Sequence, residues 1–209
     1  MTDVQRSPRI AMCRLGSCLN RLRADRRGVA AVEFALLVPL LLSLYFVTME
    51  VSQAVETSKK VSRVASMTAD LVTQQSSITQ AEVKAVMDIG EALLQPYNRS
   101  APAIMVTAIQ MSNDATPKAT VVWSRKLKDG AHSAGIAKGT ELTDVPAKLK
   151  VAGTFLVRVE SALEYRPVVT WTASEKTTLG LTAAFDKIQM GDTYYLRPRM
   201  SDAVPCADC

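Results

Sequence analysis

The chain has 209 residues and a formal net charge of +5. Residues 1–28 hold seven arginines and two aspartates, so this leader accounts for the whole excess, and residues 34–209 carry only +1. The positive charge therefore belongs to a short leader and not to a nucleic-acid-binding surface, and we expect no nucleic acid among the partners.

An apolar run covers residues 29–47, and Glu33 is its only charged residue. As a helix these nineteen residues would be about 28 Å long, close to the hydrocarbon thickness of a bilayer. The arginines before the run predict that the N-terminus stays in the cytoplasm while the rest of the chain crosses the membrane. We therefore predict three regions, which are a basic cytoplasmic leader over 1–28, a transmembrane helix over 29–49 and a periplasmic domain over 50–209.

A glycine precedes the apolar run at a characteristic distance from the acid within the run. If the chain were cut after Gly28, Val29 would be the new N-terminus. Glu33 and Phe34 would then be the fifth and sixth residues. A basic leader, a glycine and an apolar helix with Glu and Phe at these places resemble the processing site of type IV prepilins. With Pro39 following, the segment resembles the TadE family of pseudopilins from tight-adherence (Flp) pilus systems.

The resemblance implies a membrane-anchored, pseudopilin-like component of Flp pilus assembly in the bacterial inner membrane. Gly28 and Val29 would be the substrate of a prepilin peptidase. Glu33 would pair with the new ammonium group of Val29, because an unpaired charge is costly in a bilayer. Phe34 belongs to the same assembly motif. The implied partners are the inner membrane, the peptidase, other pilins or pseudopilins and the pilus assembly machinery.

Two alternatives stay open. The first is a signal-anchored periplasmic binding or scaffold protein that is never cleaved. The second is a membrane-tethered enzyme that uses the cysteines or His132, the sole histidine, which lies in a glycine-rich stretch with no suggested partner. Because no phosphate-binding loop, dinucleotide motif or zinc-protease motif occurs, we expect no enzymatic activity, no cofactor and no small-molecule substrate.

Four cysteines occur in two pairs. Cys13 and Cys18 lie in the leader and are expected to stay reduced in the cytosol. Cys206 and Cys209 end the chain, and in a periplasmic domain they would form a local disulfide or remain as two thiols. A zinc site would need further ligands, and His132 is far away in sequence, so we predict no metal site.

The apolar run is predicted to continue as an amphipathic helix, with a second helix after it. Pro39 lacks an N–H group and predicts a kink in the membrane segment. Thr79 and Glu82 have the spacing of a capping box, so the second helix should begin there. It should run to about Leu94, because Pro96 follows. The first helix should pack one apolar stripe against the folded domain: Val51, Ala54, Val55, Val61, Val64, Ala65, Thr68, Leu71 and Val72.

Strand signals follow the second helix and predict an α+β domain with a small, mostly antiparallel sheet. Residues 103–111 and 120–127 predict a hairpin. Residues 128–152 are rich in glycine and charge and predict an exposed loop. Residues 168–190 are ambiguous between a loop with a short helix and extended chain. Residues 193–197 predict a final strand, which Pro198 confines to an end or an edge of the sheet.

Residues 154–166 are the clearest strand, because apolar and charged side chains alternate. The apolar side chains should point one way: Phe155, Val157, Val159, Leu163 and Tyr165. The charged ones should point the other way: Arg158, Glu160, Glu164 and Arg166. We interpret Glu160 and Glu164 as part of a solvated face and not as a glycosidase pair. Residues 164–167 and 194–199 also resemble the TadE family, in its aromatic strand ending in proline and its arginine-rich closing motif.

Overall fold

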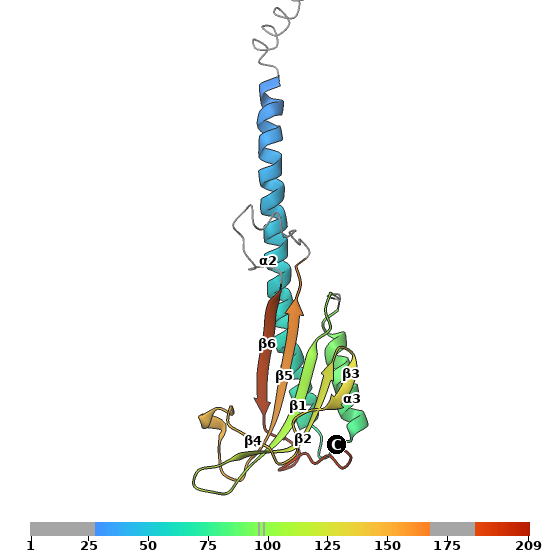
Figure 1. Cartoon of the computed structure of the whole chain (residues 1–209), viewed down its shortest axis with the longest axis vertical. Helices are drawn as coiled ribbons and strands as arrows, with labels where there is room; N and C mark the ends of the chain where they lie inside the picture. The colour runs from blue at the N-terminus through green and yellow to red at the C-terminus, as the bar shows by residue number, and fades with distance from the viewer. Residues whose placement is uncertain (1–27, 96, 98, 168–186) are drawn as a thin grey trace, which may run out of the picture. The chain divides into compact units, whose positions relative to one another are not determined.

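The structure, a computed structural model, describes residues 28–95, 97, 99–167 and 187–209 (Figure 1). Its helices are α2 (Val29–Thr73), α3 (Gln80–Ala92) and the short 3-10 helix η2 (Ala147–Leu149). Its strands are β1 (Ala103–Met111), β2 (Ala119–Lys128), β3 (Ala131–Ala134), β4 (Glu141–Leu142), β5 (Phe155–Tyr165) and β6 (Ile188–Leu196). The predicted α+β class is therefore confirmed. The chain divides between Met49 and Glu50 into two compact units, and we call residues 50–209 the C-terminal domain.

Helix α2 is continuous over 45 residues, including Pro39. The kink predicted at Pro39 stays a prediction. In the C-terminal domain α2 buries one stripe: Thr57, Val61, Val64, Ala65, Thr68, Ala69, Val72 and Thr73. The prediction was wrong for Val51 and Val55, which are 57% and 49% exposed. Both residues precede Thr57, where the buried stripe of α2 begins, so they lie on a part of the helix that the core does not cover.

Helix α3 begins as predicted. Thr79 is the N-cap, its side chain accepts a hydrogen bond from the Glu82 N–H, and the Glu82 carboxylate accepts one from the Thr79 N–H in return. Both orphan donors of the first turn are thus satisfied, which is the stabilising feature of a capping box. Val83 and Met87 are fully buried. A Cβ at Gly90 would lie 3.1 Å from both Ile104 Cδ1 and Thr68 Oγ1, so a glycine lets α3 approach α2 and β1 closely.

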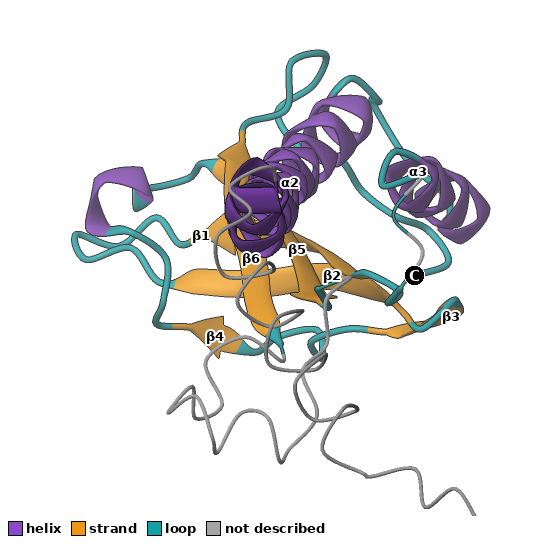
Figure 2. Cartoon of the chain, turned by 90° about the horizontal axis from the view of Figure 1, so that it is seen from above, coloured by secondary structure: helices purple, strands orange, loops and turns teal. Residues whose placement is uncertain are grey.

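The strands form one sheet in the order β3-β2-β1-β5-β6, with β4 also paired to β2, and every pairing is antiparallel. Helices α2 and α3 cover one face of it (Figure 2). The core lies between these layers and draws its sheet residues from alternate positions: Ile104, Val106, Ala108, Trp123, Leu127, Phe155, Val157, Val159 and Leu163. The predicted hairpin is the β1–β2 pair, and the inward face predicted for the long strand is confirmed in β5.

The opposite face of the sheet carries a second, smaller core, which the sequence did not predict. Residues 128–152 were predicted to be an exposed loop. Most of them are exposed, but they also contain β3, β4 and η2, which the prediction missed. Leu142 and Val145 pack with residues of the sheet such as Ile109 and Leu156. Two apolar residues scattered among glycines and charges show no strand or helix period, so the pattern did not reveal them.

Strand β6 is longer than predicted and begins at Ile188. It is the terminal strand in the order of the described sheet, and Pro198 comes two residues after its last residue, in agreement with the predicted edge position. Of the ambiguous segment over 168–190, residues 168–186 lie outside the described part of the chain.

Candidate functional site

The predicted processing site lies where α2 starts. Val29 is the first residue of the helix, and Gly28 precedes it. Both residues are exposed, and no described atom outside its chain neighbours lies within 4 Å of a Cβ built on Gly28. Within the described part of the chain, the Gly28–Val29 peptide bond is therefore not covered by other residues.

Glu33 lies one helical turn after Val29. Residues four apart in a helix are neighbours on one side, so the main-chain nitrogen end of Val29 and the Glu33 carboxylate share a face. Glu33 is exposed, and no residue of the described ranges forms an ion pair with it. Phe34 is 67% exposed and therefore also offers its whole ring to a neighbour.

The segment around these residues has the character of a membrane anchor. Among the described helices, α2 is the one that is long and apolar enough to cross a membrane, and its most apolar 18-residue window contains no buried residue. The large side chains that it exposes include Leu36, Leu40, Leu44 and Phe46. Exposure of so many apolar side chains is stable in lipid and very unfavourable in water, which supports the membrane anchor.

A polar cluster lies where the C-terminal domain begins. The hydroxyl group of Tyr165 donates a hydrogen bond to Glu50 Oε1 over 2.5 Å, although the two residues are 115 positions apart. Tyr165 is fully buried, and its ring stacks on that of Tyr97 with centroids 5.3 Å apart. Burial, and then the bond to Glu50, raises the pKa of Tyr165 to about 12. The hydroxyl therefore stays protonated at physiological pH and remains a donor.

Arg99 closes the same cluster. Its Nη1 donates to the carbonyl oxygen of Arg166 over 2.8 Å, and its Nη2 donates to Gln53 Oε1 over 3.2 Å. The guanidinium carbon lies 5.5 Å from the centre of the Tyr97 ring, within the range of a cation–π contact. The end of β5, the loop before β1 and the first turns of α2 in the domain are thus joined by Arg99 and Tyr165.

Loss of the Tyr165 hydroxyl should weaken this junction. We expect Tyr165→Phe to lower the free energy of unfolding of the domain by about 1.5–3 kcal/mol, since the hydrogen bond is made to an ionised carboxylate. Chemical unfolding of the purified full chain in detergent, followed by circular dichroism, measures the change. Tyr45→Phe is the matched control, because Tyr45 is 60% exposed in the apolar segment. Equal stability of Tyr165→Phe and the natural chain would contradict the expectation.

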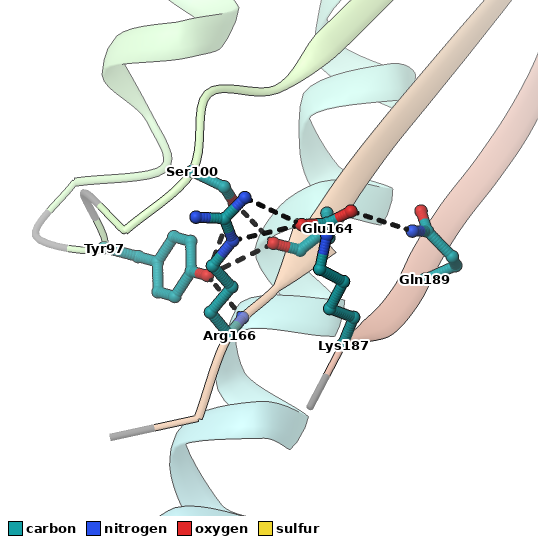
Figure 3. Close-up of polar contacts among 6 residues, drawn as sticks. All are labelled: Tyr97, Ser100, Glu164, Arg166, Lys187 and Gln189. Atoms are coloured by element: carbon teal, nitrogen blue, oxygen red, sulfur yellow. Dashed lines mark hydrogen bonds and ion pairs between the residues drawn. The ribbon is translucent and has the colours of Figure 1, made fainter. Parts of the chain in front are cut away.

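Glu164 is the centre of a second set of contacts on the outward side of the same strand end (Figure 3). Its Oε1 lies 2.9 Å from Arg166 Nη2 and 3.2 Å from Lys187 Nζ, while Gln189 donates to Oε2 over 3.5 Å. Hydrogen bonds from Arg166 and then Lys187 lower the pKa of the Glu164 carboxyl. The carboxylate is therefore a partner of two cations and has no acidic proton to give at neutral pH.

Arg158 corrects the interpretation of a solvated face. It points outward from β5 as predicted, but it is only 2% exposed. Its Nη1 lies 2.7 Å from Asp144 Oδ2, and its Nη2 lies 3.3 Å from Glu160 Oε2. Burial raises the pKa of Glu160, although the Arg158 charge opposes the shift. Asp144 lies in the segment between β4 and η2. Its ion pair with Arg158 therefore holds that segment against the sheet.

His132 has a partner that the sequence did not indicate, and the terminal cysteines adopt one of the two states that the sequence left open. His132 lies in β3, and its Nε2 is 2.9 Å from Asp88 Oδ1 on α3. Cys206 and Cys209 are joined by a disulfide. Asp208 lies between the two cysteines, and its Oδ1 accepts a hydrogen bond over 2.7 Å from the N–H group of Gln80. Gln80 is the first residue of α3. Asp208 therefore holds the tail against the start of α3, and the disulfide closes the short loop that contains Asp208.

Comparison with known proteins supports the N-terminal site. Residues 28–70 match the model of a family described as TadE-like protein. Searches of curated proteins and of solved structures found no match. The matched segment begins at Gly28 and ends three residues before the end of α2, so it contains the predicted processing motif, the apolar helix and most of the buried stripe. Over this segment the chain is similar to the TadE-like family, in agreement with the resemblance of its motif.

Proposed function

We propose that the chain is a membrane-anchored, pseudopilin-like component of tight-adherence pilus assembly that a prepilin peptidase cleaves after Gly28. The main support is that the TadE-like match begins at Gly28, directly before the apolar run, and that Glu33 lies one turn into α2 and is exposed. An uncleaved anchor would not need a glycine and an exposed acid in this register.

The proposed location is the inner membrane, with the leader in the cytoplasm and the C-terminal domain in the periplasm. The leader's seven arginines favour the cytoplasmic side for the N-terminus. The disulfide between Cys206 and Cys209 fits an oxidising compartment for the opposite end of the chain. The domain itself acts by binding and not by catalysis, since the acidic groups around Arg158 and Glu164 are held in ion pairs.

Packing against neighbouring pilin-like helices is the proposed mode of assembly. Val51 and Val55 extend the exposed apolar surface of α2 past the apolar run, on a side that the described domain leaves open. They lie four residues apart, so together they form one apolar strip on the helix. A second apolar helix, from another pilin or pseudopilin, would remove this strip from water.

Cleavage would complete the site by creating a charge. The new ammonium group at Val29 lies on the face of the helix that carries Glu33. Within one chain, or between adjacent chains, the two groups neutralise each other and allow the helix end to enter an apolar assembly. Glu33 is therefore the residue that makes the mature N-terminus compatible with packing.

The test is the N-terminal sequence of the protein purified from native membranes. We expect Val29 as the first residue, and we expect Gly28→Val to abolish cleavage because a branched side chain cannot enter a narrow peptidase site. Gly28→Ala is the matched variant and should retain most of the processing. Mature protein of normal size from Gly28→Val, or a natural chain that still carries its leader, would leave the uncleaved binding or scaffold protein as the better description.

A further inference from the structure

A polar cavity of about 430 Å³ lies beside the Glu164 cluster, at one end of the sheet. Arg99, Lys128 and Arg166 line it, together with Asp129, Glu164 and Gln189. Lys187 is not part of its lining, but it lies 3.2 Å from Glu164. Four cations and two carboxylates thus gather at one opening, and the balance is positive.

The two carboxylates neutralise only part of this positive charge. Glu164 is already bound by Arg166 and Lys187 (Figure 3). Lys128 is exposed, and no residue of the described ranges forms an ion pair with it. The cavity therefore keeps cationic donors for a ligand, and phosphate oxygens are acceptors that Lys and Arg bind well.

The place of the cavity along the chain indicates the source of the phosphate. The polar cluster of Tyr165 and Arg99 lies next to it and is hydrogen-bonded to α2. Tyr165 bonds to Glu50, and Arg99 bonds to Gln53. Glu50 and Gln53 follow Val47, the end of the apolar run, by three and six residues, which is roughly 5–9 Å along a helix. A bilayer's head-group region extends about 5–7 Å beyond its hydrocarbon core. If the run spans the membrane, Glu50 and Gln53 are therefore close enough along the chain to be at the level of the lipid head groups.

We propose that this cavity binds the phosphate of an anionic phospholipid head group and so holds the domain against the membrane surface. The inference rests only on the membrane-anchor part of the proposed function. Tyr97, whose ring lies against Arg99 of the lining and is only partly buried, agrees with it, because tyrosine is favoured at membrane interfaces. Head-group contact would restrain the domain while leaving the opposite end of the sheet free for partners.

The experiment uses the full chain in nanodiscs that contain phosphatidylglycerol and phosphatidylcholine in equal amounts, with a photoreactive amino acid in place of Gln189. Mass spectrometry then identifies the lipid that is crosslinked. We expect adducts mainly with phosphatidylglycerol. Lys128→Glu with Lys187→Glu should reduce these adducts about tenfold, as expected for reversal of two interfacial charges. Lys148→Glu with Lys150→Glu makes the same change of net charge away from the cavity and should have little effect.

Several outcomes would overturn the inference. These are no lipid adduct at position 189, equal adducts with both lipids, or an equal loss in both pairs of variants. Suppression of the adduct by excess inorganic phosphate at constant ionic strength would assign the cavity to free phosphate instead. A photoreactive group in place of Asn113, in the β1–β2 turn, should give no adduct. Processing after Gly28 is measured on the same samples, so failure here is distinct from failure of the proposed function.

Discussion

Exchange of both acids around Arg158 for their amides, Asp144→Asn with Glu160→Gln, should lower the free energy of unfolding of the domain by about 3 kcal/mol. The arginine is 2% exposed and is held by both carboxylates. Without them its charge would stay buried with no opposite charge beside it. Loss of one side of a buried ion pair is strongly destabilising for this reason, even where the whole pair contributes little.

Two comparisons isolate the charge from packing. Arg158→Met added to the double variant should restore most of the lost stability, since it removes the buried charge and keeps an apolar side chain of similar length. Glu141→Gln breaks an exposed pair with Lys118 and should change stability by no more than about 0.5 kcal/mol. Urea unfolding of the full chain in detergent gives all four values. Failure of Arg158→Met to restore stability would place the loss in packing.

The single exchange Glu160→Gln should be much milder than the double one. Burial holds the pKa of Glu160 above its ordinary value, so the folded state keeps this proton longer than the unfolded state does. Its contribution favours folding at low pH and is lost as the pH rises from about 4.5 through the folded-state pKa. An amide resembles the protonated acid, and Asp144 still pairs with Arg158. The two exchanges are therefore expected to be non-additive.

The parts of the fold that the sequence predicted best are those with a strong local sequence signal. The boundaries of β1 over 103–111 agree with the prediction, because a dense run of β-branched and apolar residues is bounded by turn residues on both sides. The start of α3 agrees because Thr79 and Glu82 form their capping box locally. The inward face of β5 agrees because its alternation extends over the whole strand.

The features that sequence missed depend on contacts between distant segments. The alternation of side chains correctly predicts that Arg158 points outward. It does not predict that residues 135–149 cover this part of the outer face and bury the side chain. Tyr165 was correctly placed on the inward face, yet nothing local indicates that its hydroxyl meets Glu50 at a separation of 115 residues. For α2, a spacing near 3.5 grouped Val51 and Val55 with the buried stripe. Their position along the helix decides their exposure, because α2 is buried only from Thr57 onward.

The candidate site was predictable for a different reason. In the proposed function a peptidase and neighbouring helices would recognise Gly28, Val29 and Glu33, so their spacing in the chain is itself the signal. The structure adds that Glu33 lies in α2 and is exposed. The cavity beside Lys128 and Arg166 carries no such spacing, because three separate segments of the chain supply its cations.

Replacement of Glu33 by glutamine or alanine should leave membrane insertion and accumulation unchanged but reduce association with partner pilins at least about tenfold. The α-ammonium group that cleavage creates at Val29 has a reference pKa near 8 and is charged at pH 7. Opposite charges about 4 Å apart attract by an amount on the order of a few kcal/mol at an effective dielectric constant near 20. Loss of the acid leaves the ammonium group unpaired, and 1.4 kcal/mol already corresponds to a factor of ten in association.

The two substitutions separate charge from size and from membrane affinity. Glu33→Gln keeps the length and some hydrogen bonding of the side chain, whereas Glu33→Ala makes the helix a better anchor. If neither variant co-purifies partner pilins although both accumulate normally, the loss of association is caused by the loss of the negative charge. Ser43→Ala is the matched control, because it also removes a polar group from the apolar run, one that bonds only to Leu40 of its own helix. Undiminished co-purification with Glu33→Ala would remove the charge-pairing mechanism and leave α2 as an anchor, since an incidental acid can be replaced without effect.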